Sequence, residues 1–270
     1  MRLAIENSPK WADNVTMSEQ MDLRKILQSW TYDPDNDART LRGEDGREIL
    51  QVRTPLGIEQ HELDGRPDGG RPHGMESALE FYEHRLQAAA AAGETAEFKL
   101  DAGACSELFN EGTLYYLRYV RLFQLKDWRR TVRDTARNLR AFDLVHRYAQ
   151  REEDQQLLER WRPYVIRVNA AAAAMMALEK REHEQALNVV DDAVKSIQAL
   201  EDMDDETFQI ERDRSLAAMA ELAEQIQKTR PLSELEKLEQ QLSAAIDRQE
   251  FERAAGLRDR IRALRKQKIC

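Results

Sequence analysis

The hydrophobic pattern near the start of the chain is that of a helix. Apolar residues recur at the i, i+3, i+4, i+7 spacing of an amphipathic helix: Leu23, Ile26, Leu27 and Trp30. Thr16 and Glu19 precede them as a capping box, in which each side chain can bond a backbone N–H group that the first helical turn leaves unpaired. The spacing predicts a helix over residues 17–30.

The pattern then changes to short segments separated by turns. A turn at 43–46 begins and ends with glycine, and residues 49–52 have the composition of a β-strand. We expect a β-hairpin within residues 38–64, with a third strand at 58–63. Residues 65–74 read GRPDGGRPHG, and this density of glycine and proline indicates a linker or an ordered loop.

Helical periodicity dominates residues 75–228, in which Pro163 is the only proline. The 3.6-residue periodicity predicts helices at 75–92, 96–109, 112–126, 128–149, 152–179 with a break near Pro163, 183–200 and 206–228. The expected fold class is therefore mainly α, an antiparallel helical array that follows a small β-element. We expect three parts, at 1–74, 75–228 and 229–270.

Two stretches of the helical region, 122–139 and 177–194, align without gaps as a helix end, a charged turn and a helix start. Around the second, small residues follow the spacing of a tetratricopeptide (TPR) repeat, a helix pair of about 34 residues. These residues are Ala170, Ala173, Ala174, Ala177, Ala186, Val190 and Ala193. The body thus resembles a TPR array. An irregular bundle is the alternative, because the two copies are 55 residues apart and leave room for an extra helix.

A TPR array has an inner groove, and the register predicts which residues line it. They are Tyr116, Val120, Phe123, Ala171 and Met175. Such an apolar surface is suited to a partner helix or peptide.

The C-terminal segment has the pattern of a short helical hairpin. Ser233 and Glu236 form a capping box, and the first stripe then consists of Leu235, Leu238, Leu242 and Ala245. After a turn at 247–249, the second helix carries a matching set: Phe251, Ala254, Ala255, Arg258, Ile261 and Leu264. A hairpin of about 35 residues has too little core to be stable alone, so we expect it to bury apolar surface on a partner.

This hairpin resembles the UVR domain of excinuclease subunits B and C, of some Clp-family unfoldases and of the activator of the protein arginine kinase. The resemblance rests on F-E-x-A-A-x-L-R-D-x-I, present as Phe251, Glu252, Ala254, Ala255, Leu257, Arg258, Asp259 and Ile261. It implies pairing with a second UVR hairpin or a partner protein. Gly256 departs from the family, which usually has a long polar residue there. The alternative is a generic amphipathic hairpin packed on its own domain.

Arginine is concentrated in residues 115–140, where aromatic residues are interleaved with it. One cationic stripe has spacings of three, four and three: Arg130, Arg133, Arg137 and Arg140. This composition is compatible with an anion or nucleic-acid site. The interpretation that we favour is structural. In it Tyr115, Tyr119, Leu122 and Trp128 are core, and the arginines pair with acidic helices at 151–159 and 201–213.

Composition and the lack of chemical motifs narrow the function. The net charge of −9 gives no overall attraction to DNA or to an anionic membrane, and nucleic acid is not the favoured partner. No apolar signal segment or membrane-length apolar run is present, so we expect a cytoplasmic protein with no membrane contact. The chain lacks a P-loop, a CxxC pair and zinc-ligand spacing, so we expect no cofactor, no metal and no catalytic residue.

The leading hypothesis is a non-enzymatic adaptor whose partner is a UVR-containing excinuclease subunit, a Clp-type unfoldase or kinase, or a second copy in a homodimer. The alternative is an accessory factor of nucleotide excision repair that contacts DNA or the excinuclease complex through arginine-rich helices. An enzyme is the third reading, based only on acids and one histidine in residues 31–74. Turns and helix caps explain most of those acids.

Overall fold

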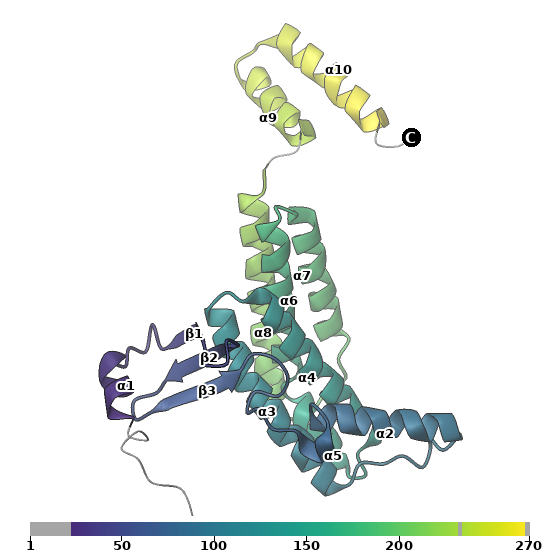
Figure 1. Ribbon diagram of the computed structural model, residues 1–270. Helices are drawn as coiled ribbons and strands as arrows, with labels where there is room; N and C mark the ends of the chain where they lie inside the picture. Colours follow the sequence, from purple (N-terminus) through teal and green to yellow (C-terminus); the bar gives the residue numbers. More distant parts are fainter. Residues whose placement is uncertain (1–22, 232–233, 268–270) are drawn as a thin grey trace, which may run out of the picture.

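The protein is described here by a computed structural model covering residues 23–231 and 234–267. It is mainly helical, with a small antiparallel sheet near the N-terminal end of the described chain (Figure 1). The strands are β1 Ala38–Arg42, β2 Glu48–Arg53 and β3 Ile58–Glu62. The helices are α1 Arg24–Ser29, η2 Pro72–Gly74, α2 Ala78–Ala92, α3 Ala102–Gln124, α4 Trp128–Tyr148, α5 Glu152–Glu159, α6 Arg162–Glu179, α7 His183–Gln198, α8 Glu206–Thr229, α9 Glu234–Asp247 and α10 Phe251–Gln267.

The three predicted strands form one sheet in the order β1-β2-β3, with both pairs antiparallel. Gly46 in the β1–β2 turn has a φ of 79°, which glycine adopts without steric cost. One side of the sheet is buried, and its core includes a side chain from α3: Ala38, Leu50, Val52, Leu63 and Leu122. The sheet therefore packs on the helical array. The first part of the predicted helix 17–30, with its Thr16 cap, lies outside the described residues, and α1 is its remainder.

The prediction of separate helices at 96–109 and 112–126 is wrong, because α3 runs unbroken from Ala102 to Gln124. The helix starts where Asp101 accepts a hydrogen bond from the backbone N–H of Ala104. Ahead of it, Leu100 is tied to the end of α4 through backbone bonds with Tyr148 and Gln150. A single Gly112 inside a long buried helix does not end it, since packing outweighs a cost of about 1 kcal/mol.

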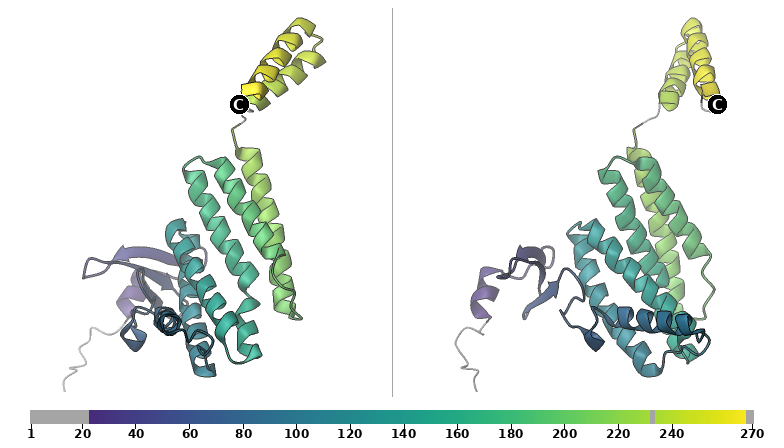
Figure 2. Two further views of the ribbon diagram at one scale, coloured as in Figure 1. Left: turned by 90° about the vertical axis from the view of Figure 1, so that its right-hand side faces the viewer. Right: turned by 45° about the vertical axis from the view of Figure 1, so that its right-hand side comes forward.

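The long helices pack side by side (Figure 2), and α6 contacts α4, α7 and α8. The predicted break near Pro163 separates α5 from α6, and Pro163 stands in the first turn of α6, where a missing N–H costs nothing. α5 is the extra helix between the two similar stretches. The α3–α4 and α6–α7 pairs therefore do not follow each other directly, as repeats of a regular solenoid do, and the TPR resemblance stays a prediction.

Three helix pairs, α3–α4, α6–α7 and α9–α10, are joined by the same turn. Each turn holds one non-glycine residue with positive φ: Lys126 at 61°, Arg181 at 64° and Gln249 at 59°. In each, the following residue donates its N–H to the carbonyl five positions earlier, over 2.8 to 2.9 Å. This bond satisfies a carbonyl that the helix end leaves unpaired. The alignment of 122–139 with 177–194 thus extends to a third copy in the C-terminal hairpin.

The C-terminal helices α9 and α10 pack against each other beyond the end of α8 (Figures 1 and 2). The predicted Ser233 cap lies outside the described residues, and α9 begins directly after it at Glu234. None of the helices within the described ranges has both the length and the apolar composition to cross a membrane.

Candidate interaction sites

The C-terminal hairpin has a small core of its own. Its buried residues are Leu238, Ala245, Ala254, Leu257 and Ile261, with Leu235, Leu242 and Leu264 partly buried around them. The small side chains of Ala245 and Ala254, on either side of the turn, let the two helices approach closely. The first helix therefore uses its predicted stripe to close the hairpin.

The second stripe differs from its prediction. Phe251, Ala255 and Arg258 were expected to share a face with Ala254 and Ile261, but the first three are exposed. A helix turns about 100° per residue, so Ala254 and Ile261 point into the hairpin while Phe251 and Arg258 lie about 60° away. The motif residues Glu252 and Asp259 are exposed as well. Among the described residues, the ion pairs of α10 involve Arg253 and Arg262, not Arg258.

Two large apolar side chains remain exposed beside the turn of this hairpin. Phe251, the first residue of α10, is 69% exposed, and Ile246 in the last turn of α9 is 53% exposed. Nearby, Gly256 also faces open space, because a Cβ built there would have no neighbour within 4 Å. Exposed aromatic and aliphatic side chains on both sides of one turn are typical of a protein interface.

The equivalent residues of the α3–α4 hairpin are covered. Trp128 is the first residue of α4, two positions after the left-handed Lys126, as Phe251 is two positions after Gln249. Trp128 is only 7% exposed. Its ring packs edge-on against Phe123, and its indole N–H donates to Glu179 of α6 over 2.9 Å. Trp128 is therefore buried by the next hairpin, α6–α7, and Phe251 lacks such a neighbour.

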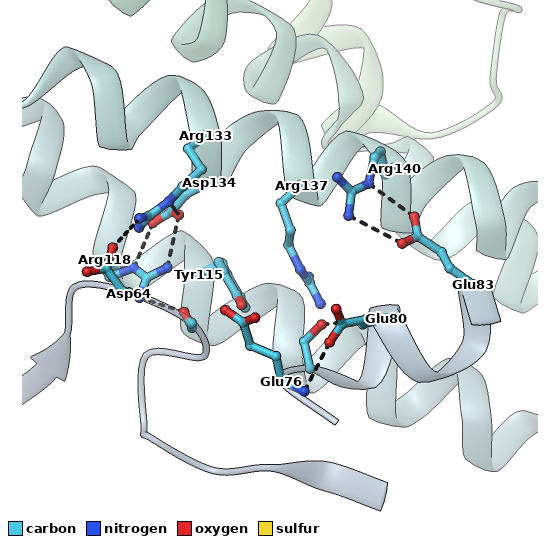
Figure 3. A pocket seen from close by; sticks show the side chains of 12 residues that line it. Asp64, Glu76, Glu80, Glu83, Tyr115, Arg118, Arg133, Asp134, Arg137 and Arg140 are labelled. Carbon is cyan, nitrogen blue, oxygen red and sulfur yellow. Dashed lines mark hydrogen bonds and ion pairs between the residues drawn. The ribbon is translucent and has the colours of Figure 1, made fainter. Parts of the chain in front are cut away.

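Three of the four arginines of the cationic stripe, Arg133, Arg137 and Arg140, line a charged cleft of about 340 Å³ (Figure 3). All four arginines of the stripe pair with a carboxylate of an earlier segment. Arg130 pairs with Glu48 of β2, Arg133 with Asp64, Arg137 with Glu111 of α3, and Arg140 with Glu83 of α2. The prediction that these arginines pair with the acidic helices at 151–159 and 201–213 is wrong.

The acidic helices bind other arginines instead. Glu159 pairs with Arg162, and Asp205 pairs with Arg160. Arg162 is three positions from Glu159, and Arg160 is the C-cap residue of α5, so the acids at 151–159 and 201–213 have arginine partners outside α4. The arginines of the stripe instead connect the sheet and α2 to the helical array. The expected core positions Tyr115, Tyr119, Leu122 and Trp128 are all buried.

A bidentate ion pair of the cleft joins Arg118 of α3 to Asp134 of α4. The guanidinium donates from Nε and from Nη2 to the two carboxylate oxygens over 2.7 and 2.9 Å, and both side chains are fully buried. Its Nη1 also donates to the backbone carbonyls of Glu62 and Gly65. One side chain thus holds the segment after β3 against two helices.

A second buried carboxylate, Glu111, fixes the start of α2. It accepts from the backbone N–H groups of Ala78 and Leu79 over 2.7 and 3.1 Å, and from the guanidinium of Arg137. Burial lowers the pKa of Arg137, and the nearby Arg140 lowers it further. Sequence reasoning missed Glu111 and Asp134. The signal for Asp134 is its position inside a predicted helix, where a buried carboxylate needs a partner. Glu111 had no such signal, because it falls between the predicted helices 96–109 and 112–126.

The predicted groove residues lie on two neighbouring hollows. Val120, Phe123 and Ala171 line one hollow together with residues of α8. Tyr116 lines the next one, and Tyr164 of α6 is common to both. Met175 lines neither. Sequence reasoning did not place α8 as the wall facing α3, because that helix is far from α3 along the chain.

Residues 233–267 match the UvrB/uvrC motif. This assigns the hairpin to the class of UVR interaction modules, and a helical hairpin of this kind points to protein–protein interaction. The match covers α9 and α10 and none of the body. No curated protein and no solved structure matches the chain.

Proposed function

We propose that this protein is a non-enzymatic adaptor that docks a second UVR hairpin through α9–α10. The partner hairpin belongs to an excinuclease subunit, to a Clp-type unfoldase or kinase, or to another copy of this chain. The helical body with its sheet then carries the second binding surface. In this proposal the partner docks beside the turn of the hairpin, where Ile246 and Phe251 are exposed.

The observation that carries this proposal is the contrast between two equivalent rings. Phe251 is 69% exposed where Trp128 is 7% exposed, and the structural difference is the hairpin that covers Trp128. Covering a phenylalanine ring contributes about 1.5–3 kcal/mol. A partner hairpin that stacks on α9–α10 as α6–α7 stacks on α3–α4 would gain this energy.

The charged cleft supports an adaptor rather than a nucleic-acid factor. A phosphate-binding surface needs cations that counterions alone neutralise, because the release of counterions drives binding. Each arginine of the stripe already has a carboxylate partner, so phosphate would have to displace it. A gel shift at low salt with single-stranded and duplex probes tests this, and binding that falls steeply with salt would favour the repair-factor alternative.

The central experiment changes Phe251 to Asp in the full chain. The ring is exposed, so we expect the hairpin to remain folded while association falls by at least tenfold, as a charge enters the apolar contact. Light scattering measures self-association. Affinity capture from a bacterial lysate, read by mass spectrometry, identifies other partners.

The matched control is Ala263→Asp, which adds the same charge at another exposed position of α10. Loss of an excinuclease subunit in Phe251→Asp alone assigns the adaptor to repair. Loss of an unfoldase or kinase assigns it to proteolysis or signalling, and a halved mass assigns a homodimer. If Phe251→Asp keeps every partner and the same mass, the hairpin is not the docking element.

A further inference from the structure

An aromatic cavity of about 390 Å³ lies in the helical body, away from the C-terminal hairpin. Six aromatic side chains from α3, α4, the α5–α6 turn and α6 line it: Phe109, Tyr116, Tyr119, Phe142, Trp161 and Tyr164. Tyr116 and Trp161 are each 42% exposed. The cavity is large enough for one bicyclic ring and small enough to exclude a helix.

Gly112 keeps this cavity open. It lies in the middle of α3, where glycine costs about 1 kcal/mol relative to alanine. It does not have positive φ, so the backbone does not require glycine. A Cβ at this position would lie 3.8 Å from Oδ1 of Asn138, an ordinary contact. An alanine would therefore fit. The absence of a side chain at Gly112 adds space to the cavity.

One polar atom in the cavity wall lacks a hydrogen bond. Oε2 of Glu211, on α8, is buried and accepts no hydrogen bond from the described residues. The other oxygen, Oε1, accepts a hydrogen bond from Arg214 over 3.3 Å, while Oε2 lies 3.6 Å from the guanidinium of Arg167. The Glu211 side chain forms part of the cavity wall. The amide of Asn138, by contrast, already donates to the carbonyl of Gly112 and accepts from Arg137.

The charges around the cavity distinguish between ligands. Arg167 lies over the Tyr164 ring at 5.1 Å, and Arg162 over the Phe142 ring at 5.7 Å. Each guanidinium group already lies over one face of its ring and repels a further positive charge. A neutral ring with one donor fits better, because it stacks in the apolar part and supplies the hydrogen that Glu211 lacks.

We propose that this cavity binds a neutral planar aromatic ring that carries an N–H donor, of which indole is the simplest probe. The ring lies among the aromatic side chains beside Gly112, and its N–H donates to Glu211. The ring can come from a free small molecule or from a tryptophan side chain of a protein. Both sources present the same chemistry to the cavity.

Titration calorimetry on the full-length protein tests the ligand class without any mutation. We expect indole to bind, 1-methylindole to bind about tenfold more weakly because it lacks the donor, and choline not to bind. Equal affinity for indole and 1-methylindole, preference for choline, or no binding of indole at millimolar concentration would each overturn the proposal. Tighter binding of N-acetyltryptophanamide than of indole assigns the ring to a protein side chain, and the reverse order to a small molecule.

Two variants locate the site. Gly112→Leu fills the space beside Asn138 and should abolish indole binding, with circular dichroism to verify that the helices persist. Gly112→Ala, which the wall accommodates, should weaken binding several-fold while keeping or raising the thermal midpoint. Phe251→Asp leaves indole binding unchanged, so the cavity and the hairpin are tested independently. Undiminished indole binding by both Gly112 variants would show that indole sits elsewhere.

Discussion

The α6–α7 hairpin of the body and the α9–α10 hairpin at the C-terminus are built on the same turn and differ in what surrounds them. Both have a left-handed residue in the turn, at Arg181 and Gln249, and buried alanines on either side of it. α6–α7 lies between α4 and α8, and its core continues into α8 through Met219 and Ile226. In α9–α10 the five buried residues all belong to the hairpin itself.

This difference teaches that local sequence decides how a hairpin closes, while its neighbours decide whether it is complete. The same turn and the same small residues produce a covered hairpin where a third helix follows. They produce an open one in α9–α10, whose core includes no described residue from another helix. A two-helix unit with so small a core gains stability by packing on another unit. The open side of α9–α10 is therefore the side on which a partner helix pair can substitute for the missing layer.

The test with the largest expected effect on stability removes the two equivalent rings one at a time. Trp128→Ala should lower the free energy of unfolding of the body by about 3 kcal/mol, because it leaves a cavity and an unpaired Glu179. Phe251→Ala should change stability by no more than about 0.5 kcal/mol, because its ring is exposed. Urea unfolding of the full chain measures both. A large loss of stability in Phe251→Ala would mean that the ring is packed in the free protein.

How well the sequence predicts this structure depends on how far apart the interacting residues lie along the chain. The sheet followed from a glycine turn between two short segments, and the C-terminal hairpin from two stripes, because those signals are local. The partners of the arginines were mispredicted because they are distant. Arg130 and Glu48 are 82 positions apart, and composition alone does not identify such a pair. Phe251 and Ala254 appeared to belong to one stripe. Only the packing of α9 on α10 shows that Ala254 is buried and Phe251 is exposed.

The second test uses Gly256, which faces open space. Gly256→Ala should stabilise α10 by about 1 kcal/mol, because its Cβ would point into open space and alanine is the better helix former. Ala255→Gly, at the adjacent exposed position, is the matched control and should destabilise α10 by a similar amount. Hydrogen exchange of the hairpin amides measures both changes. If Gly256→Ala stabilises the helix but reduces association, the partner packs over Gly256, and the open side is wider than Ile246 and Phe251.

The smallest expected effect separates the two regions by their response to acid. His61 of β3 is buried, its Nε2 has no hydrogen bond within the described residues, and burial lowers its pKa below the usual value of 6.5. The folded sheet therefore prefers the neutral imidazole. Its stability is complete above about pH 6.5 and falls as the pH decreases toward the lowered pKa, because the unfolded chain binds the proton more readily. Residues 229–270 contain no histidine, so α9–α10 should not show this dependence.

Hydrogen exchange at pH 7.5 and at pH 5.5, corrected for the intrinsic exchange rate, compares the sheet with the hairpin in one sample. His61→Gln should remove the pH dependence of the sheet, whereas His84→Gln, at an exposed position of α2, should leave it unchanged. An equal loss of protection in both regions would attribute the acid response to the overall charge of the chain rather than to His61.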